Sequence, residues 1–200
     1  MIALPAVASQ RSRQREATRR QLLEAGLRMV ATEGFAGTST AAIAQATGKA
    51  HGTVFLHFRT RDALVAEIVA EIGRSMSDRL AALETATPTL REVIDAHLTA
   101  LAEHEVLYAR VLAEASTLPP AARARLFALQ SAIASRLRAA HARARTAGEV
   151  RALDAVVAAN LWIALTNHYL MNRDLFAPGE SVVVKCGADL AAQWLALVST

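Results

Sequence analysis

Apolar residues recur at steps of three and four along most of this chain, and this spacing constrains the fold more than any other feature. Leu64, Ile68, Ile72 and Met76 form one such row, and a similar row runs through residues 126–137. Residues spaced in this way share one face of an α-helix. Alanine, the best helix former, supplies 45 of the 200 residues, against only 9 glycines and 5 prolines. The sequence therefore predicts an all-α fold.

Other structural classes conflict with the composition. A β-sandwich or barrel needs many β-branched and aromatic residues, but aromatic residues make up only 4% of the chain. The hydrophobic fraction of 53% and the net charge of +4 argue against disorder. The single cysteine, Cys186, excludes an internal disulfide and a thiolate metal cluster.

The sequence pattern also argues against a membrane-spanning segment and a signal peptide. The longest uncharged stretch, residues 155–172, approaches spanning length but contains three asparagines, a threonine and a histidine, which are too polar for lipid. Residues 1–10 lack the basic start and the apolar run of a signal peptide, so we interpret them as a flexible tail. We expect a cytoplasmic protein with no membrane partner.

Caps and helix breakers divide the remainder into helices. The expected helices, in chain order, are residues 17–32; a short one capped by Thr38-Ser39-Thr40 and ended by Gly48; residues 50–56; a long one capped by Thr60; one capped by Thr87, with Pro88 first, through Leu101; a separate one through Tyr108 and Leu112; one from Pro119-Pro120 to Gly148; residues 151–172; and one through Leu197.

The short second and third helices indicate a helix-turn-helix. Ala44 is small where the two helices would cross, Gly48 can adopt the positive φ of the turn, and Val54 can pack the later helix inward. Residues 1–65 carry a net charge of +5, whereas residues 66–200 carry −1. Such a distribution is typical of a domain that meets an anionic polymer.

Residues 18–64 resemble the DNA-binding domain of the TetR family of bacterial transcription regulators. The matching stretches are Thr18-Arg19-Arg20-Gln21-Leu22-Leu23-Glu24-Ala25, Glu33-Gly34-Phe35, Thr38-Ser39, Ile43-Ala44, Gly48, Gly52-Thr53-Val54-Phe55-Leu56-His57-Phe58 and Thr60-Arg61-Asp62-Ala63-Leu64. The resemblance implies a three-helix DNA-binding domain, for which we take residues 11–60. It also implies an effector-binding and dimerisation domain, residues 61–200, and usually repression that a small molecule relieves.

The chain departs from the family pattern on its DNA-reading surface. Lys49 stands where the family usually has an apolar residue, and Ala50 replaces the serine that caps the reading helix. His51 replaces a common lysine, and Phe55 replaces the usual tyrosine. The operator preferences of relatives therefore do not transfer to this chain.

The third helix is expected to enter the major groove, with its first residues nearest the bases. His51 and Thr53 are candidates for polar contacts with bases or phosphates, and Phe55 and Leu56 for apolar contacts with sugars or thymine methyl groups. For Phe55 the alternative is packing in the local core.

Phosphate contacts are expected around that helix, where they would fix register. Thr40 and Arg61 begin the neighbouring helices, and Lys49 lies in the turn. His57 completes the predicted DNA-binding set. For Lys49 the alternative is a solvated turn residue, and for His57 a structural role.

A small apolar or aromatic effector, held by one or two hydrogen bonds, is expected in a cavity of the second domain. The predicted effector-binding residues are Met76, His97, Leu101, Tyr108, Leu112, Phe127 and Trp162. The alternative for each of them is ordinary core packing.

A homodimer is expected because residues 155–172 are apolar around much of the helix and need a second covering surface. The predicted interface residues are Val157, Leu161, Leu165, Tyr169, Leu190, Trp194 and Leu197. The alternative is burial within one protomer. A two-fold dimer would recognise a palindromic operator on double-stranded DNA.

The sequence thus predicts a DNA-binding transcription regulator, with repression as the first hypothesis and activation or effector-independent regulation as alternatives. A helical enzyme or metal-binding protein is the alternative from another class. His97 and His104 lie seven residues apart and could share a metal, but no phosphate loop, nucleophile elbow or metalloprotease motif is present. We therefore predict no catalytic residue, no metal and no cofactor.

Overall fold

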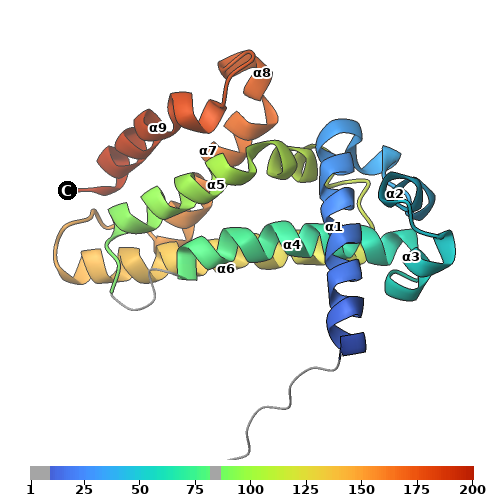
Figure 1. Ribbon diagram of the computed structural model, residues 1–200. Helices are drawn as coiled ribbons and strands as arrows, with labels where there is room; N and C mark the ends of the chain where they lie inside the picture. The colour runs from blue at the N-terminus through green and yellow to red at the C-terminus, as the bar shows by residue number, and fades with distance from the viewer. Residues whose placement is uncertain (1–9, 82–86) are drawn as a thin grey trace, which may run out of the picture. The chain divides into compact units, whose positions relative to one another are not determined.

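The computed structural model describes residues 10–81 and 87–200 (Figure 1). Its internal contacts divide the chain into Met1–Ile68, here called the N-terminal unit, and Val69–Thr200, the C-terminal unit. That division lies beyond the domain boundary expected at residue 60. All but the last residue of the expected flexible tail lie outside the described residues.

The all-α prediction is confirmed. The β-structure of the described residues is limited to a single isolated bridge between Val150 and Ser199. The helices are α1 (Gln10–Gly37), α2 (Thr40–Thr47), α3 (His51–His57), α4 (Arg61–Ala81), α5 (Leu90–Ala113), α6 (Pro120–Thr146), α7 (Ala155–Met171), α8 (Arg173–Phe176) and α9 (Val182–Val198). In the described ranges, none of them is both long and apolar enough to cross a membrane.

The N-terminal unit packs α1, α2, α3 and the beginning of α4 around one small core. Leu22, Ile43, Val54 and Leu64, one from each of these helices, are completely buried. Gly26 of α1 permits the closest approach in this core, because a Cβ atom there would lie 2.8 Å from the Ile68 Cδ1 atom. Helices α1, α2 and α3 and the beginning of α4 are therefore held as one body.

Local capping places the helix-turn-helix where the sequence predicts it. Ser39 accepts a hydrogen bond from the Ala42 backbone N–H, and α2 ends at Gly48 with a left-handed φ of 63°. Ala50 gives α3 no side-chain cap. Thr60 accepts a hydrogen bond from the Ala63 N–H at the start of α4. The turn and both of its flanking helices are thus fixed by residues within the motif.

Two helix boundaries in the C-terminal unit differ from the prediction. The cap of α5 is Thr89 and not Thr87, because Thr89 forms a capping box with Glu92 in which each side chain bonds the other's backbone N–H. The helices expected to be separate around Leu101 and Tyr108 form one helix, α5, with a local break at His104 (φ −121°, ψ 15°). Its buried face continues across the break, so packing preserves a helix that local sequence would end.

The C-terminal unit has its core between α5, α6, α7 and α9, with α9 beside both α5 and α7 (Figure 1). Trp162 of α7 is completely buried, and Trp194 of α9 contacts it edge-on with ring centroids 5.7 Å apart. The Trp194 indole N–H donates to the Ala158 carbonyl at 3.2 Å. This pair of indoles fixes α9 against α7.

Candidate functional site

Helix α3 has one buried and one exposed face, as a DNA-reading helix requires. Val54 is completely buried and attaches the helix to the N-terminal unit. His51, Phe55 and Leu56 are exposed, and the exposed fractions of Phe55 and Leu56 are 45% and 75%. Large apolar side chains that are this exposed on a seven-residue helix indicate a surface that contacts a partner.

The exposed residues at the start of α3 are held by α2. The Thr40 hydroxyl lies 3.2 Å from His51 Nε2, and the His51 ring meets Phe55 edge-on with centroids 5.1 Å apart. The structure therefore brings together three predicted DNA-binding residues from two helices. Thr53 lies beside them and is half-buried.

Arg61 has a partner inside the N-terminal unit. Its Nε donates to the Thr38 carbonyl at 3.0 Å, and its Nη2 donates to the Phe35 carbonyl. These carbonyls lie where α1 ends and α2 begins, so Arg61 holds that junction. The sequence pattern predicts a phosphate contact for Arg61, and the structure gives it a positioning role as well.

The remaining predicted DNA-binding residues lie at the edges of the same surface. Lys49 is half-buried, and its backbone N–H donates to the Ala44 carbonyl. His57 is also half-buried, and its pKa is lowered by burial and then by the nearby Arg15 and Arg19. The lowered pKa means that His57 contributes less positive charge to the surface near pH 7 than an exposed histidine would.

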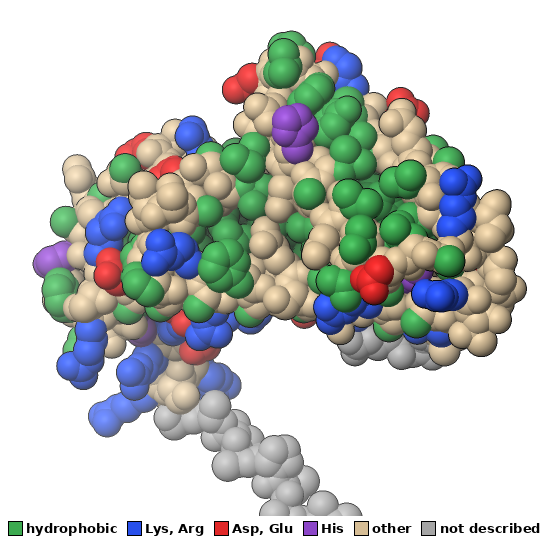
Figure 2. Space-filling model, turned by 180° about the vertical axis from the view of Figure 1, so that it is seen from behind, with side chains coloured by type: hydrophobic (Ala, Val, Ile, Leu, Met, Phe, Trp, Pro, Cys, Tyr) green, Lys and Arg blue, Asp and Glu red, His purple; other side chains and the backbone are tan. Residues whose placement is uncertain are grey.

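A basic region at the start of α1 lies outside the set of contact residues that the sequence motif predicts. Arg11, Arg13 and Arg15 are exposed there, and blue side chains surround this end of the helix in Figure 2. The basic flank was visible in the sequence, but no motif assigned it a role. Arg19 is different, because it pairs with Glu67 and lies 5.5 Å from the Phe58 ring centre.

Six of the seven predicted effector-binding residues lie in the core of the C-terminal unit. They are Met76, His97, Leu101, Tyr108, Leu112 and Trp162. Phe127, by contrast, is 60% exposed. The structure joins His97 to Trp162 through a hydrogen bond of 2.9 Å, and Tyr108 to Gln130 at 3.4 Å.

A small cavity lies among α5, α7 and α9, and Leu101 is the one predicted effector residue that lines it. Its volume is about 10 Å³. Its lining residues are Leu98, Leu101, Thr166, Tyr169, Leu170, Val182, Val183, Gly187 and Leu190. The spacing of apolar residues could not reveal this cavity, since most of its walls come from helices that the sequence predicts as the dimer interface.

His97 and His104 bond different partners. His97 faces Trp162 of α7, whereas His104 Nε2 lies 2.8 Å from the Ser75 hydroxyl of α4. The metal-binding alternative requires both imidazoles to bind one metal ion. The two contacts give each histidine a separate environment, and His104 is only half-buried.

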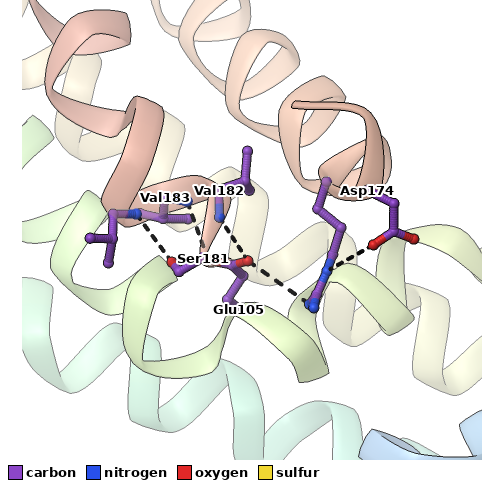
Figure 3. Close-up of polar contacts among 7 residues, drawn as sticks. Glu105, Asp174, Ser181, Val182 and Val183 are labelled. Carbon is purple, nitrogen blue, oxygen red and sulfur yellow. Dashed lines mark hydrogen bonds and ion pairs between the residues drawn. The ribbon is translucent and has the colours of Figure 1, made fainter. Parts of the chain in front are cut away.

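Glu105 forms a polar anchor that sequence reasoning missed (Figure 3). Its carboxylate accepts hydrogen bonds from the Ser181 hydroxyl, from the Val182 N–H at 3.1 Å and from the Val183 N–H at 3.2 Å. The carboxylate is buried at the first turn of α9, where the helix dipole favours negative charge. It joins α5 to α9 across 76 residues of sequence.

The predicted dimer residues fall into three groups by burial. Val157, Leu161 and Leu197 are exposed, at 46%, 43% and 53%, and Leu165 and Tyr169 are half-buried. Leu190 and Trp194 are buried inside the protomer. Figure 2 shows hydrophobic side chains gathered on the side where α7 and α9 lie. An open groove of about 330 Å³ adjoins them, lined by Arg151, Ala152, Leu153, Leu161 and Leu197.

The turn at Gly48, the exposed face of α3 and the positive charge of the N-terminal unit define a helix-turn-helix DNA-binding protein. Two family profiles agree with this class. "Bacterial regulatory proteins, tetR family" matches residues 22–68, and "Tetracyclin repressor-like, C-terminal domain" matches residues 84–170. The chain belongs to the TetR family and is a DNA-binding transcriptional regulator.

Solved structures agree with the fold over nearly the whole length. A TetR-family regulator from Agrobacterium tumefaciens is 16% identical, with a TM-score of 0.76 over 93% of this chain and 100% of that one. A regulator from Saccharomonospora viridis, in complex with choline, is 20% identical, with a TM-score of 0.73 over 92% and 99%. FadR from Bacillus subtilis, in complex with stearoyl-CoA, is 18% identical, with a TM-score of 0.72 over 88% and 97%. No curated protein matches the sequence significantly.

Proposed function

We propose that this regulator is a homodimeric repressor that leaves a palindromic operator when a small molecule binds its C-terminal unit. The observation that carries the DNA-binding part is the exposed face of α3, held in place by the Thr40–His51 contact. Choline and stearoyl-CoA in two structures of similar fold support a ligand-binding role for the C-terminal unit. The two ligands differ greatly, so neither of them is assigned to this chain.

Within this proposal, each exposed residue of the reading surface has a distinct task. His51 and Thr53 contact base edges or nearby phosphates, and Phe55 and Leu56 cover sugars or thymine methyl groups. Lys49 and the exposed arginines of α1 neutralise phosphates, which adds affinity without sequence preference. Arg61 acts through the α1–α2 junction that it holds.

Selection of bound sites from random DNA tests this function directly. We expect a palindromic consensus, and we expect His51→Ala to change the preference at particular positions. Lys49→Ala should weaken binding to all sequences alike and make the dependence on salt less steep. Recovery of a non-palindromic consensus, or of the same consensus with His51→Ala, would contradict this assignment. Reporter transcription from the selected site then distinguishes repression from activation.

A further inference from the structure

The C-terminal unit contains an imidazole whose protonation is fixed by one neighbour. The Trp162 indole N–H donates to His97 Nδ1 at 2.9 Å. An indole nitrogen can only donate, so Nδ1 must be the unprotonated nitrogen that accepts. Burial lowers the pKa of His97 to about 4, and the ring is therefore neutral near pH 7. Its single proton lies on Nε2.

That Nε2–H group is a buried donor without an acceptor among the described residues. The whole His97 side chain is only 2% exposed. Nearly all buried polar groups in folded proteins have a hydrogen-bond partner, so an unpaired one needs a specific explanation. A ligand that brings an acceptor would supply the missing partner.

The cavity among α5, α7 and α9 begins one helical turn from the His97–Trp162 pair, although neither of these two residues lines it. Leu101 follows His97 by one turn on α5, and Thr166 follows Trp162 by one turn on α7. Residues four apart share a helix face, so the His97–Trp162 pair lies on the faces that line the cavity. Helix α9 forms the third wall. It approaches α5 closely at Gly187, where an added Cβ atom would lie only 3.2 Å from Leu98 Cδ2.

We propose that His97 Nε2–H recognises a neutral hydrogen-bond acceptor, such as a ketone, ester or lactone carbonyl, on an otherwise apolar effector. This rests on the proposed ligand-binding role of the C-terminal unit. Six of the nine residues that line the cavity are leucine or valine and none of the nine is charged, so a carboxylate would lose its hydration without gaining a positive partner there. An ammonium group would place its own donors against the Nε2–H group.

The cavity must widen when such a ligand enters. Its present volume of about 10 Å³ corresponds to roughly one water molecule. An apolar ligand with a carbonyl group would therefore have to move side chains of α5, α7 and α9 apart to reach His97.

Three probes of similar size separate the acceptor from the apolar body: acetophenone, ethylbenzene and the cationic α-methylbenzylamine. We would titrate each into the full-length protein and record the imidazole NMR resonances of labelled His97. Acetophenone should bind about fivefold to tenfold more tightly than ethylbenzene, the usual effect of one net hydrogen bond. It should also shift the Nε2–H resonance, and the amine should bind most weakly.

Two variants of His97 form a matched pair for the same titrations. In His97→Asn the side-chain oxygen can still accept from Trp162, but the donor at the Nε2 position is lost. In His97→Gln the amide N–H group can occupy the Nε2 position. The preference for acetophenone over ethylbenzene should disappear with asparagine and persist with glutamine.

Three results would overturn the proposal: equal affinity for acetophenone and ethylbenzene, a preference that survives His97→Asn, or no binding of any probe. Equal affinity would mean that a bound water already satisfies the donor. DNA binding is measured separately with the selected operator and no probe. A protein that binds acetophenone through His97 but binds no operator would refute the proposed function and leave this inference intact.

Discussion

At the scale of single residues, the conformation of Gly48 can be tested against a neighbouring glycine. Gly48 has a left-handed φ, and no atom lies within 4 Å of a Cβ placed there, so Gly48→Ala adds backbone strain without a clash. We expect a loss of about 1 kcal/mol in the free energy of unfolding, measured with urea. Gly52 has equally open space and lies inside α3, so Gly52→Ala should stabilise the protein by about 0.5–1 kcal/mol. Changes of the same sign would refute this explanation.

His97 should make the protein less stable in mild acid. Its pKa is 6.5 when exposed and about 4 in the folded protein, so between these pH values the unfolded chain binds a proton that the folded chain does not. The free energy of unfolding should therefore decrease as the pH falls from 6.5 toward 4, by up to about 3 kcal/mol from this group. His97→Asn removes this contribution. We would compare urea unfolding of both proteins across that range, and a constant difference between them would contradict the prediction.

At the scale of helices, Glu105 should matter more than Glu103, although both belong to α5. Glu105→Gln leaves two donors at the first turn of α9 facing an amide that accepts fewer hydrogen bonds, at a cost of about 1–3 kcal/mol. Glu103 forms an exposed ion pair with Arg79, so Glu103→Gln should cost less than about 1 kcal/mol. Hydrogen exchange at Val182–Val184 provides a local readout. Equal protection of these amides in the two variants would show that Glu105 does not hold α9.

The sequence predicts where the helices lie along the chain far better than it predicts which helices contact each other. Gly48 and Thr60 act through neighbours a few residues away, and the structure confirms the predicted role of each as a helix end and a helix cap. Glu105 accepts hydrogen bonds from Ser181 and Val182, which follow it by 76 and 77 positions, and no local sequence pattern marks such a contact. Periodicity also indicates that Trp194 lies on an apolar helix face, but it does not indicate which residue covers that face. In the structure Trp162 of the same protomer covers Trp194. Phe127 is an error of the opposite kind. Its apolar side chain predicts a position in the core, but 60% of it is exposed.

At the scale of the whole molecule, the proposed dimer can be tested with residues that are exposed in one protomer. Leu161→Glu would place an unpaired carboxylate in the interface, at a cost of about 3–5 kcal/mol of association free energy. We expect sedimentation to report a monomer and operator affinity to fall. Val106 on α5 has nearly the same exposure, 44% against 43%, so Val106→Glu is the matched control and should remain dimeric. A dimer that persists in Leu161→Glu would move the interface away from α7.

The N-terminal unit is a continuous stretch of chain, and this has a consequence for the order of events during synthesis. Every partner in its small core lies within the first 68 residues, so these helices can assemble while the ribosome is still adding the rest. Helix α9 (Val182–Val198), by contrast, emerges only after residues 69–181 have been added. A nascent chain would thus acquire its operator-reading shape well before it can find a second copy. If the proposed dimer forms through α7 and α9, translation stopped before α9 would release a product that can contact only one half of a palindromic operator and binds it weakly.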